Sequence, residues 1–399
     1  MRSPWSVRLI APLASAALAA TTGCATIHRP PITVAQLQQD AVTAARAEDA
    51  ARDSVLARLV RRVAARGDRT IDVLMLSGGG QNGAFGAGFL RGWQARTDSH
   101  LPSFDLVTGI STGALQAPFA LVGSKAAIDT LGELYREAEK RVAPKLDFWF
   151  WLRKSGGVAN MKRYDKAVLD MLNGTFRNEL RAGLRDGRQI VVATTDYDLG
   201  VGRTWLLNDV YDTTTTALAS SQQLLKAATS IPGVFPPVIL ENHVHGDGGV
   251  VTNVLPLFSF ADYQRLSSML KERGINDVTI RMYVVMNLWS HAKPQITDPA
   301  SRKKITDRAN FMLFYSHQPQ TIELLDALSR AVTNGVPGMR VEFKVATQPA
   351  ELALEPGADK LFDHAFVQKL DSLGFEKGRS SKPWDVVPSA FSRPAPIKK

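Results

Sequence analysis

The sequence predicts an α/β fold in which a mostly parallel central sheet lies between two layers of helices. Short apolar runs rich in β-branched residues alternate with stretches of helical periodicity, which is typical of a parallel sheet covered on both faces. The expected strands are residues 71–76, 105–108, 189–194, 238–240, 278–285 and 339–345. The expected helices are residues 84–96, 113–121, 128–141, 162–173, 216–228, 261–272 and 305–333. Because 399 residues exceed what one core usually organises, we expect one large domain with appendages.

Composition excludes several classes of protein. Apolar residues make up 45% and charged residues 22%, which is ordinary for a globular chain and excludes a wholly disordered or fibrous one. A single Cys excludes an internal disulfide framework and any multi-cysteine metal site. The formal charge of +10 permits contact with nucleic acid or with an anionic membrane surface.

The N-terminus predicts export. Arg2 and Arg8 precede twelve uncharged residues, 9–20, which would reach only about 18 Å as a helix and cannot span a bilayer core of about 30 Å. Residues 1–23 are therefore expected to be a secretory signal peptide. The only Cys, Cys24, follows directly, and the arrangement resembles a bacterial lipoprotein signal.

That resemblance implies that Cys24 is acylated and becomes the mature N-terminus. The alternative is a plain secretory signal followed by an incidental thiol. Ala25 is not the acidic residue that retains lipoproteins in the inner membrane, which favours an outer-membrane anchor facing the periplasm. Removal of residues 1–23 takes away two arginines and no acid, so the mature chain carries +8. We interpret this surplus as attraction to an anionic membrane and expect no nucleic-acid partner.

The rest of the chain divides into three parts. Residues 24–70 are expected to form a tether and a helical spacer, because residues 33–66 lack Gly and Pro and show partly helical spacing before Gly67. Residues 71–345 hold the alternating strands and helices and form the expected catalytic domain. Residues 346–399, rich in Pro, Lys and Ser, are expected to wrap around the domain or fray.

A G-x-S-x-G motif is the first candidate for chemistry. Gly109, Ser111 and Gly113 follow an expected strand and precede an expected helix, which is the context of a nucleophile elbow. Small flanking residues allow Ser111 to occupy a strained turn, and the helix behind it supplies backbone N–H groups.

A run of glycines after the first strand is the second candidate. Gly78, Gly79 and Gly80 expose backbone N–H groups, as an oxyanion hole requires. A dinucleotide-binding loop would need an acid closing a second strand, but Asp98 lies in a polar, loop-like stretch. A P-loop would need Gly-Lys-Ser or Gly-Lys-Thr, which is absent from this run. Close packing of helix on strand would also explain Gly83, and is compatible with an oxyanion role.

The third candidate is Asp247, which precedes Gly248 and Gly249. An isolated Asp-Gly-Gly is most often a hairpin turn, so its interpretation depends on the other blocks. With the stretch at residues 228–237, the three motifs follow the order found in patatin-like phospholipases. The resemblance covers residues 71–345 and implies the three-layer α/β/α patatin-like fold.

The resemblance also implies a mechanism. Patatin-like enzymes hydrolyse acyl esters with a Ser–Asp dyad, without a catalytic His and without a cofactor. Carried over, Ser111 is the nucleophile and Asp247 the proton acceptor. The expected oxyanion donors would be Gly78, Gly79, Gly80 and Thr112. The motif glycines would be Gly83, Gly109, Gly113, Gly248 and Gly249. Two positions depart from the family pattern: Asn82, where many members have Arg, and Pro256, which falls one residue late.

Other groups remained as competitors. Asp196 and Asp198 end an expected strand and are rival bases. His291 or His317 could complete a Ser–acid–His triad. His243 and His245 alternate with Asp247 on one face of a strand, as in a metal site, but no fourth ligand is evident and we predict no metal.

Two apolar segments are further candidates for contact with lipid or for the core. Residues 145–154 combine aromatic side chains with cations, which suits a membrane interface, the lip of an acyl pocket or a core segment equally. The apolar residues of the long helix 305–333 are better explained by core packing.

The sequence as a whole predicts a lipid-anchored serine esterase acting on acyl esters, with phospholipid or lysophospholipid as the expected substrate. An acyltransferase or thioesterase would use the same dyad. A binding lipoprotein with a degenerate site is the non-enzymatic alternative. The sequence leaves the oligomeric state open.

Overall fold

The computed structural model describes residues 27, 29–141, 145–146, 159–171, 174–210, 215–288, 296–358, 360 and 362–387. Cys24 and the expected signal peptide lie outside these residues. So do His291 and all but two residues of the aromatic segment 145–154. Among the described helices, none is both long and apolar enough to cross a bilayer.

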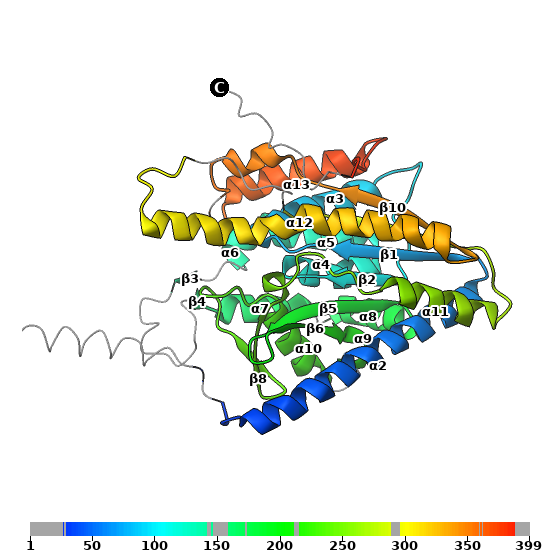
Figure 1. The fold of residues 1–399 in the computed structure, drawn as a ribbon. Coiled ribbons are helices and arrows are strands. Elements are labelled where there is room, and N and C mark those ends of the chain that lie inside the picture. The colour runs from blue at the N-terminus through cyan, green and yellow to red at the C-terminus, as the bar shows by residue number, and fades with distance from the viewer. Residues whose placement is uncertain are drawn as a thin grey trace, which may run out of the picture.

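The fold is a three-layer α/β/α sandwich, as predicted (Figure 1). The sheet has the order β10-β9-β1-β2-β5-β8-β7, and β6 pairs with β5. Strands β10, β9, β1, β2 and β5 are parallel, whereas β6, β7 and β8 are joined by antiparallel pairing. The strands are β1 Thr70–Leu76, β2 Leu106–Gly109, β5 Gln189–Asp196, β6 Val201–Leu206, β7 Val238–Leu240, β8 His243–Asp247, β9 Val278–Val285 and β10 Met339–Ala346. A separate two-stranded ladder pairs β3 Lys145–Leu146 with β4 Ala159–Asn160.

The helices cover both faces of the sheet. They are α2 Val34–Arg66, α3 Gly83–Gln94, α4 Thr112–Val122, α5 Lys125–Arg136, α6 Ala138–Arg141, α7 Lys162–Met171, α8 Gly174–Arg185, α9 Leu207–Val210, α10 Thr215–Ala228, α11 Phe260–Lys271, α12 Arg302–Gly335 and α13 His364–Arg379. Side chains alternate along β1, so that Leu74 and Leu76 enter the core shared with α3, α4 and α5. Ile71 and Val73 enter the opposite core, shared with α2, α11 and α12.

Helix α2 is the expected N-terminal helix, and it acts as a cover on the sheet. Thr33 caps its first turn and Gly67 ends it in the left-handed conformation (φ 72°). Val55, Leu59 and Val63 are buried against the strands, and their spacing of four residues places them on one face of the helix. The second half of α2 is therefore part of the folded body.

Helix α13 corrects the expectation that residues 346–399 only wrap or fray. Its Phe366 and Leu370 are buried in the same core as α3. The two helices approach at their backbones: a Cβ added at Gly374 would lie 2.1 Å from the carbonyl oxygen of Phe85, and one at Gly88 would lie 2.1 Å from that of Asp371. The expectation rested on Pro, Lys and Ser content, which does not show that glycines at positions 88 and 374 let two helices pack closely.

Candidate active site

Ser111 and Asp247 come together because two strands share one edge of β5. At Val192, β5 pairs with Gly109 of β2 on one side and with β6 on the other. Two residues later Thr194 still pairs with β6, but its other partner is Asp247 of β8. Strand β8 thus continues the edge where β2 ends and runs in the opposite direction. The turn after β2 and the end of β8 meet head to head.

The turn that carries Ser111 is held open by glycines. Ser111 has φ 51° and ψ −121°, a backbone conformation that residues other than Gly rarely adopt. It directly precedes α4. A Cβ at Gly113 would lie 2.3 Å from the carbonyl oxygen of Leu76, and one at Gly109 would lie 2.4 Å from that of Gly113. No larger residue fits either place, so the G-x-S-x-G spacing follows from how closely strand, turn and helix approach.

The Ser111 hydroxyl donates a hydrogen bond to Asp247, with 2.6 Å between Oγ and Oδ2. The other carboxylate oxygen, Oδ1, accepts from the amide of Gly249 at 2.7 Å. Asp247 is 5% exposed, and burial raises its pKa to about 6, although the bonds from Ser111 and Gly249 act to lower it. The carboxylate is therefore charged at neutral pH and basic enough to accept a proton.

The glycine loop lies beside this dyad, and it corrects one expected donor. The amide of Gly78 donates to the backbone carbonyl of Asn253 at 3.1 Å, so it is not available to an oxyanion. Gly80 (φ 56°) and Thr112 begin helical turns, where the geometry leaves N–H groups without intrahelical acceptors, and Gly79 directly precedes Gly80. Gly79, Gly80 and Thr112 remain the candidate donors.

Asn287, which follows β9, fixes the glycine loop and was not predicted. Its side-chain amide donates to the carbonyl of Ser77 at 2.8 Å, and its backbone N–H donates to the Ser77 hydroxyl at 2.7 Å. Asn82, the departure from the family pattern, donates from its side chain to the carbonyl of Gly79 at 3.0 Å. The Asn82 side chain therefore supports the loop from within and does not extend toward a ligand.

Asn253 is a second residue that sequence reasoning missed. It is 6% exposed, and within the described part of the chain neither polar atom of its side-chain amide has a hydrogen-bond partner. Its Oδ1 lies 2.5 Å from the point that a Gly78 Cβ would occupy, and the Cβ of Ser111 lies 3.2 Å from that same point. The signal available in the sequence was its place six residues after Asp247.

The remaining motif glycines allow similarly close contacts. A Cβ at Gly83 would lie 2.4 Å from the Thr112 hydroxyl, and one at Gly248 would lie 2.6 Å from the carbonyl of Ala193. At Gly249 it would lie 3.0 Å from the Asp247 carboxylate. These glycines bring the glycine loop, the nucleophile turn and the carboxylate into one small volume.

An apolar pocket opens next to Ser111. Its polar groups are already paired: the Tyr135 hydroxyl bonds to that of Thr112, and the Tyr164 hydroxyl to that of Thr229. Burial raises the pKa of Tyr135 to about 12, so this phenol stays neutral. The apolar lining includes Leu115, Phe119, Leu131, Leu134, Val168 and Phe235. Such a surface suits an aliphatic chain.

The rival acids have other partners. Asp196 Oδ1 accepts from the backbone amides of Asp198 and Leu199, both at 3.0 Å. Its Oδ2 lies 2.8 Å from His243 Nδ1. Asp198 pairs with Arg29 and accepts from a backbone amide of β8. Neither acid contacts Ser111 in the structure.

The expected alternation on β8 does not assemble a metal site around Asp247. Within the described residues, Asp196, Asp198 and His243 lie close enough to share an ion. Arginine side chains and backbone N–H groups already bind the carboxylates of Asp196 and Asp198. Ion pairs therefore explain why these three side chains lie together. His245 is fully buried, its Nδ1 is 2.9 Å from the Thr194 hydroxyl, and burial lowers its pKa to about 4.

Two competitors lie outside what the structure describes. His291 is not among the described residues, and although His317 belongs to α12, its side chain is not described. The triad alternative for these two histidines therefore stays untested.

Comparison with known families agrees with this geometry. Residues 74–261 match the sequence model of the family described as patatin-like phospholipase. The match spans the glycine loop, the Ser111 turn and Asp247. These residues therefore form a patatin-like phospholipase domain. No curated protein matches the chain significantly. The patatin-like phospholipase family implies lipid acyl hydrolase activity. Helices α12 and α13 and strands β9 and β10 lie beyond the matched residues.

Proposed function

We propose that this patatin-like protein hydrolyses acyl esters of phospholipids or lysophospholipids with a Ser111–Asp247 dyad, through an acyl-enzyme. The observation that carries the proposal is the 2.6 Å hydrogen bond from Ser111 Oγ to a buried carboxylate. A serine hydroxyl becomes an effective nucleophile when a base at this distance removes its proton.

In the first half-reaction, Ser111 Oγ attacks the ester carbonyl while Asp247 accepts the hydroxyl proton. The acyl chain would occupy the apolar pocket lined by Phe119 and Leu134. The tetrahedral oxyanion would accept hydrogen bonds from candidate amides of the glycine loop and of Thr112, each contributing about 3 kcal/mol in comparable sites. Asp247 then donates the proton to the leaving alcohol, and the acyl group remains on Ser111.

In the second half-reaction, water replaces the alcohol. Asp247 removes a proton from water as its oxygen attacks the acyl carbonyl. The tetrahedral intermediate then collapses, Asp247 returns the proton to Ser111 Oγ, and the fatty acid is released. If an alcohol or thiol entered in place of water, the same steps would transfer the acyl group. The choice between hydrolase and acyltransferase thus depends on which acceptor reaches the acyl-enzyme.

Hydrolysis assays test the dyad. The substrates are a medium-chain nitrophenyl ester and phospholipid dispersed in detergent, with Ser111→Ala and Asp247→Asn compared with wild type. Each variant should lose about three orders of magnitude in kcat/KM, because each removes one member of a unit that acts together. Ser99→Ala, at an exposed position, and Asp129→Asn, at a half-buried position, are matched controls and should retain activity. An active Ser111→Ala enzyme would exclude the proposal.

We further propose that the chain is anchored through an acylated Cys24 in the outer membrane of a bacterial envelope, facing the periplasm. The support is the sequence alone: a short apolar segment, then Gly23, Cys24 and the neutral Ala25. Labelling cells with a radioactive or alkyne fatty acid should mark the wild-type chain and leave Cys24→Ser unmarked. Label on Cys24→Ser would contradict this anchor.

A further inference from the structure

Helix α12 is much longer than the strands it covers. Its 34 residues extend about 51 Å, whereas the eight residues of β9 extend about 26 Å. Its C-terminal half is fixed to the sheet: the Thr333 hydroxyl accepts from the amide of Val341, and Ile322 and Leu325 are buried in the core. The excess length therefore lies at the N-terminal end, and Figure 1 shows that end projecting past the sheet.

The projecting end lies on the side of the active site. Helix α12 leads directly into β10, which runs parallel to β1 and β2 through β9, so α12 starts near the carboxyl ends of these strands. The glycine loop and the Ser111 turn follow those same ends. The chain also enters the domain at this edge, because Arg29 pairs with Asp198, just after the end of β5.

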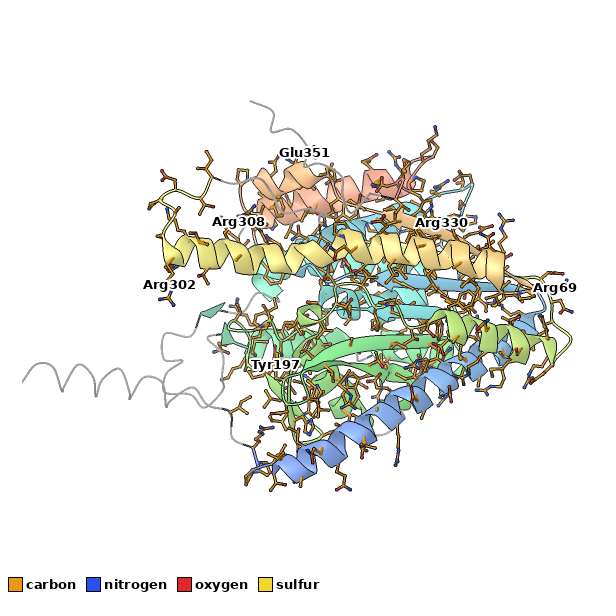
Figure 2. The ribbon with its side chains drawn as sticks, viewed as in Figure 1. Arg69, Tyr197, Arg302, Arg308, Arg330 and Glu351 are labelled. Atoms are coloured by element: carbon orange, nitrogen blue, oxygen red, sulfur yellow. The ribbon has the colours of Figure 1, made fainter. Side chains whose placement is uncertain are left out.

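We call residues 296–312 the α12 tip. It holds four cationic residues and two acidic ones: Arg302, Lys303, Lys304, Arg308, Asp298 and Asp307. All six residues from 301 to 306 are exposed. Figure 2 shows Arg302 and Arg308 at this end, with Arg69 at the opposite end of the molecule.

Apolar side chains accompany these cations. Ile296 is 89% exposed, Ile305 51% and Met312 49%. Arg302, Ile305 and Met312 are spaced by three and seven residues, which places them on one face of the helix. One exposed apolar residue is ordinary, but apolar and cationic residues sharing a face at a projecting helix end match the chemistry of an interfacial helix.

We infer that the α12 tip docks the protein on an anionic lipid bilayer. The cations would lie among the lipid phosphates, while Ile305 and Met312 would enter the boundary between headgroups and acyl chains. Docking there would place the dyad and its apolar pocket on the side of the molecule that faces the lipid. The benefit to catalysis rests on the proposed function, whereas the docking itself does not.

Vesicle flotation tests the docking. The chain carries Cys24→Ser, so that no acyl anchor forms, and Ser111→Ala, so that vesicles stay intact. It is mixed with vesicles of phosphatidylglycerol and phosphatidylcholine, or of phosphatidylcholine alone. Binding to the anionic vesicles should be stronger and should fall as salt is added. Equal binding to both vesicle types would overturn the inference.

A charge-reversed pair identifies the surface. Arg302→Glu with Lys304→Glu should weaken partitioning to anionic vesicles at least 30-fold, because two cations that each favour binding about fivefold are replaced by acids. Arg69→Glu with Arg330→Glu makes the same change in net charge on the part of the molecule away from the tip and should retain binding within about threefold (Figure 2). Equal losses in both pairs would mean that only net charge matters, which would contradict the assignment to α12.

Kinetics separate docking from catalysis. With Ser111 intact, Arg302→Glu with Lys304→Glu should slow hydrolysis of esters in anionic vesicles but leave kcat/KM for a soluble ester unchanged. A parallel loss on the soluble ester would indicate damage to the site and would count against docking. If wild type hydrolyses neither ester but the Cys24→Ser chain still binds anionic vesicles more strongly than neutral ones, the proposed function fails and the docking stands.

Discussion

Helices α4 and α12 both begin on the active-site side of the sheet, and their first turns are constrained in opposite ways. The start of α4 is buried: Ser111 is 7% exposed and holds a positive φ, and Gly113 touches the backbone of β1. The start of α12 is capped by the Ser301 hydroxyl and is exposed to solvent. Backbone packing therefore fixes the first turn of α4, whereas the first turn of α12 is distinguished by its charge and by the length of the helix. Chemistry would thus occur at the start of α4, while the start of α12 is the surface that would bring lipid to it.

Of the changes considered, disrupting the packing at the start of α4 should have the largest effect. Gly113→Ala places a Cβ 2.3 Å from the carbonyl oxygen of Leu76, so strand and helix must separate. We expect a loss of about 4 kcal/mol or more in the free energy of unfolding, as for severe overpacking. Gly202→Ala, whose Cβ would have no neighbour nearer than 3.4 Å, is the matched control and should stay within about 0.5 kcal/mol. Urea unfolding measures both, and equal stabilities would contradict the packing argument.

A second change should stabilise the buried site while removing its chemistry. Asp247 has a pKa of about 6 in the folded protein against an ordinary 3.8, so the folded state favours the protonated form. The charged carboxylate therefore costs stability as pH rises from about 4 to 6 and above. Asp247→Asn should raise the free energy of unfolding by about 1–3 kcal/mol at pH 8 and by nothing below pH 4. A variant less stable than wild type at pH 8 would show that burial does not dominate at this site.

The same pKa predicts the pH dependence of the reaction. Asp247 accepts a proton only when it is charged, so kcat/KM for a soluble ester should rise about tenfold per pH unit below pH 6 and level off above it. Asp247→Asn should have residual activity without this inflection. A wild-type inflection near pH 7 that disappears in His291→Ala would instead indicate a histidine base.

The smallest expected effect concerns the exposed helix start. Arg302→Glu with Lys304→Glu places acids in the first turn of α12, where the helix dipole favours them, so stability should stay within about 0.5 kcal/mol of wild type. Thermal unfolding measures this. Tolerance at α12 together with intolerance at α4 would confirm that packing constrains only the start of α4, whereas a large loss at α12 would mean that its tip is packed.

The active-site motifs could be predicted because each has a physical requirement that few residues meet. Only glycine fits at positions 109 and 113, and only an acid at position 247 can accept the Ser111 proton. The spacing of these blocks therefore identified both the turn and its partner. The parallel sheet could be predicted for a similar reason, since strands buried on both faces consist of continuous apolar runs.

The features that sequence reasoning missed leave weaker traces. The bond from Gly78 to Asn253 joins two backbones and places no demand on side-chain type. Gly374 and Gly378 of α13 contact the backbone of α3, whereas the Pro, Lys and Ser content of residues 346–399 indicated only wrapping or fraying. Helical periodicity predicted α12, yet the pattern is the same whether a turn lies on a sheet or extends past it. How far α12 extends past the sheet depends on the lengths of the strands, which are known only from the folded structure.

The most direct test of the dyad is covalent labelling with a fluorophosphonate, followed by peptide mass spectrometry. We predict one adduct, on Ser111, that is absent from Ser111→Ala and forms about three orders of magnitude more slowly in Asp247→Asn. An adduct on another serine of folded wild type, or an unchanged rate in Asp247→Asn, would contradict the assignment of nucleophile and base.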